Sequence, residues 1–421
     1  MRLKLVSLLV LAALVPAAAN ASSSARFGIQ DDAWLMSGPG TTAQRIATLR
    51  QLGVGMVRFT LRWDAVASSR PTSARNPADA AYDWASFDAV LQPLRAAGIT
   101  ALVTIYGSPS WANGGHPANW LPSTGAIGDF AYAAAKHYPW VHMWTAWNEP
   151  DTRVFSVPVS PGLYVQRVLN PMYAGLHAAS RSNLVGGGVT GPRQPPGGMS
   201  PLAFMLGMRA ARARLDAYAQ NPYPVTPGET PTRTPCATCG SLTMAVLPTI
   251  RADVTRLFGA KPLWLTEYGY QTNPPDRILG VSLARQAQYL SDAALRVLEQ
   301  PGVTVLIQFL IRDEPSIGGW QSGLFTAAGR PKPSYYAYPL PLAEVSRSGS
   351  NVALWGQIRP GSGARQYVLQ QARGGRWVAV GAVQPTGAGG SFRRVVALAS
   401  GTRVRIFAPQ LHLASPPLTL T

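Results

Sequence analysis

The hydrophobic positions of the chain follow two alternating patterns between about residues 27 and 340. Short continuous runs of apolar residues alternate with longer stretches in which apolar residues recur every three or four positions. The longer stretches, such as 41–52, 86–97, 163–180 and 282–299, predict helices. The short runs predict eight strands: RFGIQ from Arg26, GMVRFT from Gly55, ITALVTIYG from Ile99, VHMWTAWNE from Val141, LVGGGVT from Leu184, LDAYAQNPY from Leu215, PLWLTEYG from Pro262 and VTVLIQFLI from Val303.

Strands that are apolar throughout and alternate with helices indicate a parallel sheet buried on both faces. Eight repeats fit a (β/α)8 barrel better than an open doubly wound sheet, and no Gly-x-Gly-x-x-Gly motif follows the first run. We therefore expect an α/β fold with a TIM barrel over residues 22–342. The Gly186–Gly188 run lacks the Lys and Ser or Thr of a phosphate loop, so we expect it to let the fifth strand pass close to its neighbours.

Residues 343–421 show a different pattern, in which short alternating strands are separated by Gly-Gly, Gly-Ser and Gly-Thr turns. This pattern predicts a small C-terminal β-sandwich domain. The segment contains nine arginines and one acidic residue, Glu344, so its net charge is +8, against +18 for the whole chain. Such a charge favours contact with an anionic polymer or a cell surface through this domain. No recognition helix, zinc finger or aromatic RNA-binding signature accompanies it, so we expect no nucleic acid partner.

The N-terminus has the pattern of a secretory signal peptide over residues 1–21. Two cations precede an apolar run, and Ala19-Asn20-Ala21 forms a small-x-small cleavage site. Its removal lowers the net charge from +18 to +16. The run is short and Ala-rich for a membrane span, and no other segment is long enough. We therefore expect a secreted, extracellular protein with no transmembrane segment.

The only two cysteines, Cys236 and Cys239, lie in a loop rich in Pro and Thr. A zinc ribbon would need two more ligands nearby, and the sequence has none there. In an oxidising compartment the favoured interpretation is a local disulfide, with a free pair as the alternative.

Two carboxylates stand at the ends of predicted strands. Glu149 closes the fourth run, in WTAWNEPD, and Glu267 closes the seventh, in PLWLTEYGY. Because the strands of such a barrel end at the same mouth, we expect the two side chains to face each other there. Hydrolysis of a glycosidic bond needs such a pair, one to protonate the leaving oxygen and one to attack the anomeric carbon or activate water. A lone glutamate would fit a buried ion pair better, but the two paired motifs favour catalysis.

The motifs WNEP at 147–150 and TEYG at 266–269 resemble the signatures of glycoside hydrolase clan A, whose members are retaining (β/α)8 enzymes. The resemblance is strongest to families 39 and 5, and it covers residues 27–340 but not the tail. It implies that Glu149 is the general acid/base and Glu267 the nucleophile. It implies no cofactor and no metal.

The resemblance also implies a substrate-binding set around these two glutamates. Asn148 would bond the sugar 2-hydroxyl, and Arg58 matches the arginine that these enzymes place beside the nucleophile. A neighbouring cation keeps a carboxylate ionised, as a nucleophile requires. The alternative for Arg58 is a structural ion pair with a barrel carboxylate such as Asp32 or Asp64.

Strand six both matches and departs from the family pattern. Tyr223 matches the tyrosine that donates to the nucleophile, whereas Asn221 replaces the histidine that many relatives carry two residues earlier. An amide cannot relay a proton, although it can still hydrogen-bond to Glu149. The tryptophan that often floors the sugar subsite on strand eight is replaced by Phe309 or another nearby residue. These departures bear on the substrate more than on the chemistry.

Aromatic residues in loops after strands are candidates for binding sugars, because sugar faces present C–H groups that pack on rings. We single out Trp111, in SPSWANGG, and Trp320, in GGWQSG, with a role in loop packing as the alternative. Asp313 and Glu314 follow the eighth run and could either bind sugar hydroxyls or lie in a solvated loop. The histidines show no metal-ligand spacing.

Together these features predict a secreted retaining glycoside hydrolase that cleaves O-glycosidic bonds of a polysaccharide or oligosaccharide by double displacement. Two alternatives stay open: a non-catalytic carbohydrate-binding or cell-wall adhesion protein on the same barrel, and a transglycosidase. The loops 191–201 and 224–240 could line a cleft or block one end of it, so both endo and exo action remain compatible with the sequence.

Overall fold

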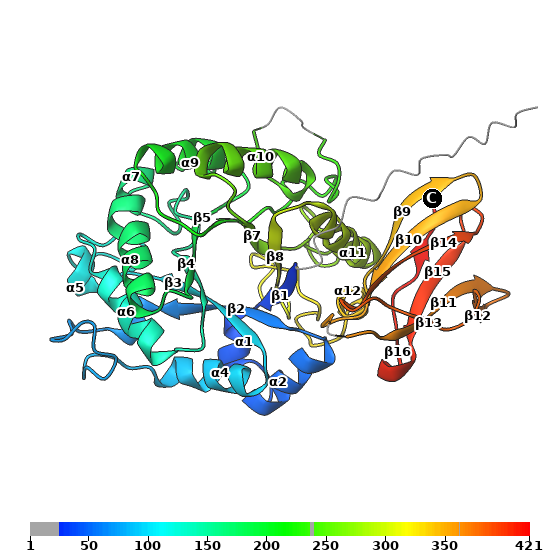
Figure 1. The fold of residues 1–421 in the computed structure, drawn as a ribbon, viewed down its shortest axis with the longest axis horizontal. Coiled ribbons are helices and arrows are strands. Elements are labelled where there is room, and N and C mark those ends of the chain that lie inside the picture. Colours follow the sequence, from blue (N-terminus) through cyan, green and yellow to red (C-terminus); the bar gives the residue numbers. More distant parts are fainter. Residues whose placement is uncertain (1–24, 236–239, 362) are drawn as a thin grey trace, which may run out of the picture.

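The computed structural model describes residues 25–235, 240–361 and 363–421. The signal peptide expected at residues 1–21 and the pair Cys236 and Cys239 lie outside the described residues. The first part of the chain forms a closed barrel of parallel strands in which each strand pairs with the next and β8 pairs with β1 (Figure 1). The strands are β1 (Arg26–Gln30), β2 (Met56–Arg62), β3 (Thr100–Tyr106), β4 (Met143–Ala146), β5 (Leu184–Thr190), β6 (Ala217–Gln220), β7 (Leu263–Tyr268) and β8 (Val303–Phe309). The predicted TIM barrel is confirmed.

Helices connect the strands and cover the outside of the barrel (Figure 1). The predicted helical stretches are all helical, and 163–180 contains a π-helical turn, Val165–Leu169, before its α-helix. The helices are α1 (Asp32–Ser37), α2 (Thr42–Gln51), α3 (Trp63–Val66), α4 (Ala85–Ala96), α5 (Ser110–Asn113), α6 (Ile127–His137), α7 (Pro161–Tyr164), α8 (Asn170–Ala179), α9 (Pro201–Ala210), α10 (Leu247–Phe258), α11 (Leu283–Glu299) and α12 (Pro333–Ala337).

Side-chain caps fix where several helices begin. Thr41 accepts from the backbone N–H of Gln44, and the side chain of Gln44 accepts from the backbone N–H of Thr41, so the pair forms a capping box before α2. Ser282 caps α11 by accepting from the N–H of Arg285. Such caps satisfy N–H groups that the first helical turn leaves without partners.

The inward-facing side chains of the barrel change from apolar to polar toward the ends of the strands. Met56, Leu102 and Trp264 belong to a buried apolar cluster inside the barrel. Two residues farther along β2 and β3, Arg58 donates to the hydroxyl of Thr104. Because side chains alternate between the two faces of a strand, a step of two residues keeps them on the inner face. The interior of the barrel is therefore apolar toward the N-terminal ends of the strands and polar toward their C-terminal ends.

Glycines in β5 leave room for large neighbours. A Cβ on Gly186 would lie 2.8 Å from the ring of Trp264, and a Cβ on Gly188 would lie 2.5 Å from the ring of Tyr218. Both distances are too short for a carbon contact. The prediction that this glycine run lets the fifth strand pass close to its neighbours is confirmed.

The C-terminal segment forms two antiparallel sheets around their own apolar core, which confirms the predicted β-sandwich. One sheet contains β9 (Leu342–Ser348), β10 (Asn351–Gln357) and β14 (Ser391–Ala397). The other contains β11 (Gln366–Arg373), β12 (Arg376–Ala379), β13 (Gln384–Pro385), β15 (Arg403–Ala408), β16 (Leu413–Ala414) and β17 (Leu418–Thr419).

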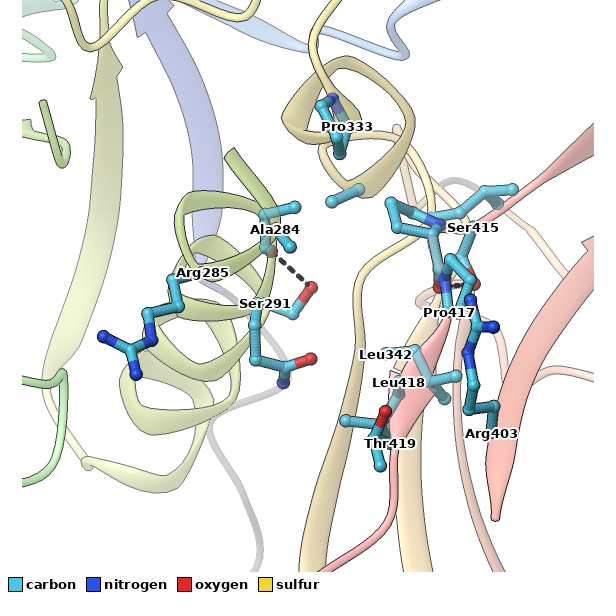
Figure 2. A pocket seen from close by; sticks show the side chains of 15 residues that line it. Ala284, Arg285, Ser291, Pro333, Leu342, Arg403, Ser415, Pro417, Leu418 and Thr419 are labelled. Atoms are coloured by element: carbon cyan, nitrogen blue, oxygen red, sulfur yellow. Dashed lines mark hydrogen bonds between the residues drawn. The ribbon is translucent and has the colours of Figure 1, made fainter. Parts of the chain in front are cut away.

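The sandwich packs against α11 and α12 of the barrel (Figure 1). Leu295 and Leu298 of α11 share an apolar cluster with Trp355 of β10, and Arg393 of β14 pairs with Glu299 at 2.7 Å. A cavity lies between these two helices and the last strands of the chain (Figure 2). Its volume is about 410 Å³. Neither of the two glutamates singled out above lines this cavity. Within the described ranges, no helix combines the length and the apolarity that a bilayer crossing needs.

Candidate active site

The fourth strand ends before the glutamate that follows it. The sequence predicted a strand through Glu149, whereas β4 ends at Ala146. Trp147 and Glu149 have φ angles of 72° and 36°, in the left-handed region that side-chain-bearing residues rarely adopt. An extended strand cannot continue through such residues, and each costs about 1–3 kcal/mol of strain.

Neighbouring strands hold this strained turn in place. The backbone N–H of Trp147 donates to the carbonyl of Ile105 at 2.9 Å, and that of Glu149 donates to the carbonyl of Val189 at 3.0 Å. The indole N–H of Trp147 donates to the carbonyl of Phe155 at 2.7 Å. Strained backbone persists only where its surroundings over-determine it, and it concentrates at functional sites. These bonds fix the direction in which the side chain of Glu149 points from the barrel wall.

Glu267, near the end of β7, is a carboxylate with a cation beside it. Its Oε1 accepts from the guanidinium of Arg58, and its Oε2 accepts from the hydroxyl of Tyr223 at 3.0 Å. Glu267 and Arg58 are both buried. Each oxygen of this carboxylate therefore has a hydrogen-bond donor, and one of the two donors is a cation. The alternative partners of Arg58 are engaged elsewhere, since Asp64 pairs with Arg62 at 2.6 Å and Asp32 accepts from a backbone N–H of β2.

Arg58 also organises the polar layer around this carboxylate. It donates to Gln30 of β1 at 2.5 Å, to Thr104 of β3 at 2.9 Å and to the side-chain oxygen of Asn148 at 2.8 Å. The last bond fixes the orientation of the Asn148 amide, because only its oxygen can accept. The N–H groups of that amide are therefore the part left to donate to a ligand.

Glu149 has a different environment from Glu267. Its Oε1 accepts from the side-chain nitrogen of Asn221 at 3.1 Å, and the oxygen of the same amide accepts from the hydroxyl of Thr266 at 2.7 Å. Burial raises the pKa of Glu149 to about 8, and the charges of Glu267 and Asp151 add to this effect. The two carboxyl groups therefore have unlike surroundings, an amide beside Glu149 and a guanidinium beside Glu267. The hydrogen bond from Asn221 to Glu149 that the sequence analysis considered possible is therefore present.

A cavity of about 220 Å³ opens in front of Glu149. Its wall includes Trp320 from the loop after β8, whose ring lies 4.8 Å from that of Tyr223 and 5.5 Å from that of Phe309. Trp320 is therefore the aromatic residue beside the tyrosine that contacts Glu267. The loops 191–201 and 224–240 both contribute to the wall. The lining residues are Glu149, Thr152, Gly191, Pro192, Arg193, Pro195, Tyr223, Pro224, Val225, Thr226, Gly269, Gln271, Leu279 and Trp320.

The structure does not bring Trp111 to this cavity. The Trp111 ring packs edge-on against Trp63 at 5.5 Å, and its indole N–H donates to the carbonyl of Ala67 at 2.8 Å. Trp111 lines a separate cavity of about 470 Å³ beside these residues. Its position fits the packing role that the sequence left open.

Asp313 and Glu314 both have partners within the protein. Asp313 is buried and forms an ion pair with Lys332 at 2.7 Å. Glu314 accepts from the backbone N–H of Trp320 at 2.7 Å, which helps to hold the loop that carries the indole. Of the two interpretations offered for these acids, neither describes Asp313, because its carboxylate is neither solvated nor open to a ligand.

Among the residues that the structure describes, no cluster of His, Cys, Asp and Glu could hold a metal ion. His137 and His177 instead bond Asp88 and Asp216, at 2.9 and 2.8 Å. His116 stacks on the ring of Trp120.

Similarity to known proteins lies at the level of structure. No protein-family model matches the chain, and no curated protein matches it. The GH39 enzyme from Xanthomonas axonopodis pv. citri superimposes with a TM-score of 0.58 at 16% identity, over 93% of this chain and 95% of that chain. A monomeric beta-xylosidase from Caulobacter crescentus gives 0.55 at 15% identity, over 91% and 96% of the two chains. GH5_18 from Streptomyces cattleya gives 0.52 at 16% identity, over 75% and 79%.

The chain has the fold of glycoside hydrolases. The expected resemblance in fold to family 39 and family 5 enzymes is confirmed by these superpositions. At such low identity the likeness concerns the fold, so the roles of individual residues rest on the geometry of this chain.

Several residues of the site are not singled out by the sequence analysis. Gln30 is a polar residue at the end of an apolar strand, a signal that could have found it, and Thr266 lies in the TEYG motif but was given no role of its own. Asp151 is buried two residues after Glu149, and its Oδ1 accepts from the N–H of Gly191 at 3.1 Å. Arg193 lies in a loop of Pro and Gly residues, where no periodic pattern indicates which side chains point inward.

Proposed function

We propose that this protein is a retaining glycoside hydrolase that cleaves O-glycosidic bonds of a glycan. The observation that carries the proposal is the contrast between two carboxyl groups at one barrel mouth. Glu267 has a guanidinium and a phenol as donors, whereas the pKa of Glu149 is raised to about 8 by burial and by neighbouring negative charge. One group is thereby held ready as a nucleophile and the other as an acid.

In the first step of the proposed reaction, Glu267 attacks the anomeric carbon while Glu149 gives its proton to the leaving oxygen. The glycosidic C–O bond breaks, and the sugar becomes an ester of Glu267. Asn148, oriented by Arg58, would donate to the 2-hydroxyl, and Trp320 would pack on one face of the sugar.

In the second step, Glu149 takes a proton from water, and the water oxygen attacks the anomeric carbon. The ester bond to Glu267 breaks, which frees the sugar and restores the carboxylate. The same carboxyl group acts first as an acid and then as a base, and the configuration of the anomeric carbon is retained. The bond from Asn221 keeps Glu149 in one place for both steps.

We also propose that the protein is exported and that its C-terminal domain contacts an anionic polymer or cell surface. The signal-like residues 1–21 support export. Arg373, Arg376 and Arg403 are exposed on the sandwich and support the contact, whereas Arg359 is buried against Phe27 and contributes nothing to such a surface.

The test is to incubate the protein and the variants Glu267→Ala and Glu149→Gln with aryl glycosides and with plant and bacterial polysaccharides. Activity should disappear in Glu267→Ala. Glu149→Gln should slow substrates with poor leaving groups by about 10²–10⁴-fold and spare activated aryl glycosides. Glycan binding without turnover by the unmodified protein would sink the proposal, and nuclear magnetic resonance of the first product would show whether configuration is retained.

A further inference from the structure

The cavity in front of Glu149 contains a cation that the proposed reaction does not use. Arg193, on the loop after β5, lines this cavity at its rim, where its side chain is exposed. Its Nη1 donates to the carbonyl of Val225 at 3.3 Å, a long bond between two loops of the cavity wall. In the described part of the chain, no carboxylate forms an ion pair with Arg193, and most of its N–H groups are left for solvent or a ligand.

The acidic residues around the cavity are occupied with other partners. Glu229 is buried and accepts from the backbone N–H of Val225 at 3.0 Å. Glu314 accepts from the backbone N–H of Trp320. Glu149 is the only other charged residue that lines the cavity, and it must be protonated to act as the acid. Among the residues that the structure describes, Arg193 therefore has no counter-ion.

A neutral sugar would displace water from this guanidinium without replacing its hydrogen bonds to an anion. Such a sugar would therefore gain little from a cation at the rim of its site. A carboxylate on the sugar would restore the bonds, because its two oxygens match the planar fork of a guanidinium. The net charge, +16 once residues 1–21 are removed, would also steer an acidic polymer toward the protein.

We propose that Arg193 selects a sugar that bears a carboxylate, so that the substrate is a uronate-containing glycan. This inference rests on the proposed function. Trp320 and Arg193 reach the cavity from the loops after β8 and β5. The indole would pack on the sugar ring while the guanidinium binds the carboxylate, a combination of apolar and ionic contacts that fixes the orientation of the ring.

The test compares substrates that differ only in charge. Polygalacturonate, alginate and hyaluronan are each offered beside a carboxyl-reduced form with the same linkages, and 4-nitrophenyl β-glucuronide beside the matching β-glucoside. The unmodified protein should prefer the acidic member of a pair. Arg193→Gln should lose about 10- to 100-fold in kcat/KM on the acidic member and change little on the neutral one. The kcat/KM of Arg193→Lys on the acidic member should lie between these two values, because lysine keeps the positive charge but lacks the planar pair of N–H donors.

Arg153→Gln is the matched control. Arg153 packs beside Gly197 on the same rim but does not line the cavity, so the variant makes the same charge change outside it. If Arg153→Gln and Arg193→Gln lost kcat/KM on the acidic substrate equally, the effect would be one of general electrostatics, and the inference would be overturned. Cleavage of the neutral members alone would overturn it as well and leave the proposed function standing. Release of no sugar from any substrate would overturn both.

Discussion

Replacing Arg58 with Met should destabilise the barrel, because it leaves the carboxylate of Glu267 buried without its cation. The guanidinium is fully buried, and it donates to Gln30, Thr104 and Asn148 as well as to Glu267. Removing one partner of a buried ion pair costs about 3–5 kcal/mol. A domain of this size loses about 2 °C of Tm for each kcal/mol, so Tm should fall by about 6–10 °C.

A double-mutant cycle separates the ion pair from the general cost of losing a large side chain. Urea unfolding would be measured for Arg58→Met, for Glu267→Gln and for the double variant. The double variant leaves no unpaired charge, so it should be more stable than the sum of the single losses predicts, by about 1–3 kcal/mol.

Arg45 provides the control for this cycle. It is also buried, but its guanidinium donates to the carbonyl oxygens of Leu35, Gly38 and Gly40 and not to a carboxylate. Arg45→Met combined with Glu267→Gln should therefore be additive within about 0.5 kcal/mol. If the losses of unfolding free energy in the Arg58 cycle were also additive, the view that this cation stabilises the buried carboxylate would be refuted.

The remaining predictions concern the pH profile and the two tryptophans. Because the pKa of Glu149 is raised to about 8 and the acid must be protonated, kcat/KM should hold up to about pH 8 and fall at higher pH. Asp151→Asn removes a neighbouring negative charge, so this fall should move to lower pH; an unmoved pH profile would contradict the electrostatic link between the two residues. Trp320→Ala should raise KM, whereas Trp111→Ala should lower Tm and leave KM unchanged, and initial-rate kinetics with thermal unfolding would distinguish the two.

The sequence was sufficient to locate the eight strands and to place one glutamate just after the fourth and one near the end of the seventh. Apolar runs that are buried on both faces leave a clear signal, and carboxylates at the ends of such runs are few. The position of Trp147 was not readable, because a tryptophan in left-handed backbone contradicts local preference and is imposed by neighbouring strands. As a result, the fourth strand was predicted too long.

The loops after the strands were less predictable than the strands. Trp111 and Trp320 look alike in the sequence, since each lies in a Gly-containing loop after a strand. Only the packing of distant segments places one of them beside Tyr223 and the other against Trp63. Arg193 went unnoticed for the same reason, because loop side chains follow no period that would tell which of them face the cavity.

The bond between Arg58 and Glu267 joins residues that are 209 positions apart in the chain. During synthesis, β2 leaves the ribosome long before β7, so an early half-barrel carries a guanidinium with no carboxylate to meet it. Burying that charge alone would be costly, which keeps the incomplete interior from closing on itself. The last strands to arrive supply both the missing wall and the missing anion. Completion of the barrel and formation of this buried ion pair are therefore one event, and a chain cut short before β7 would lack both.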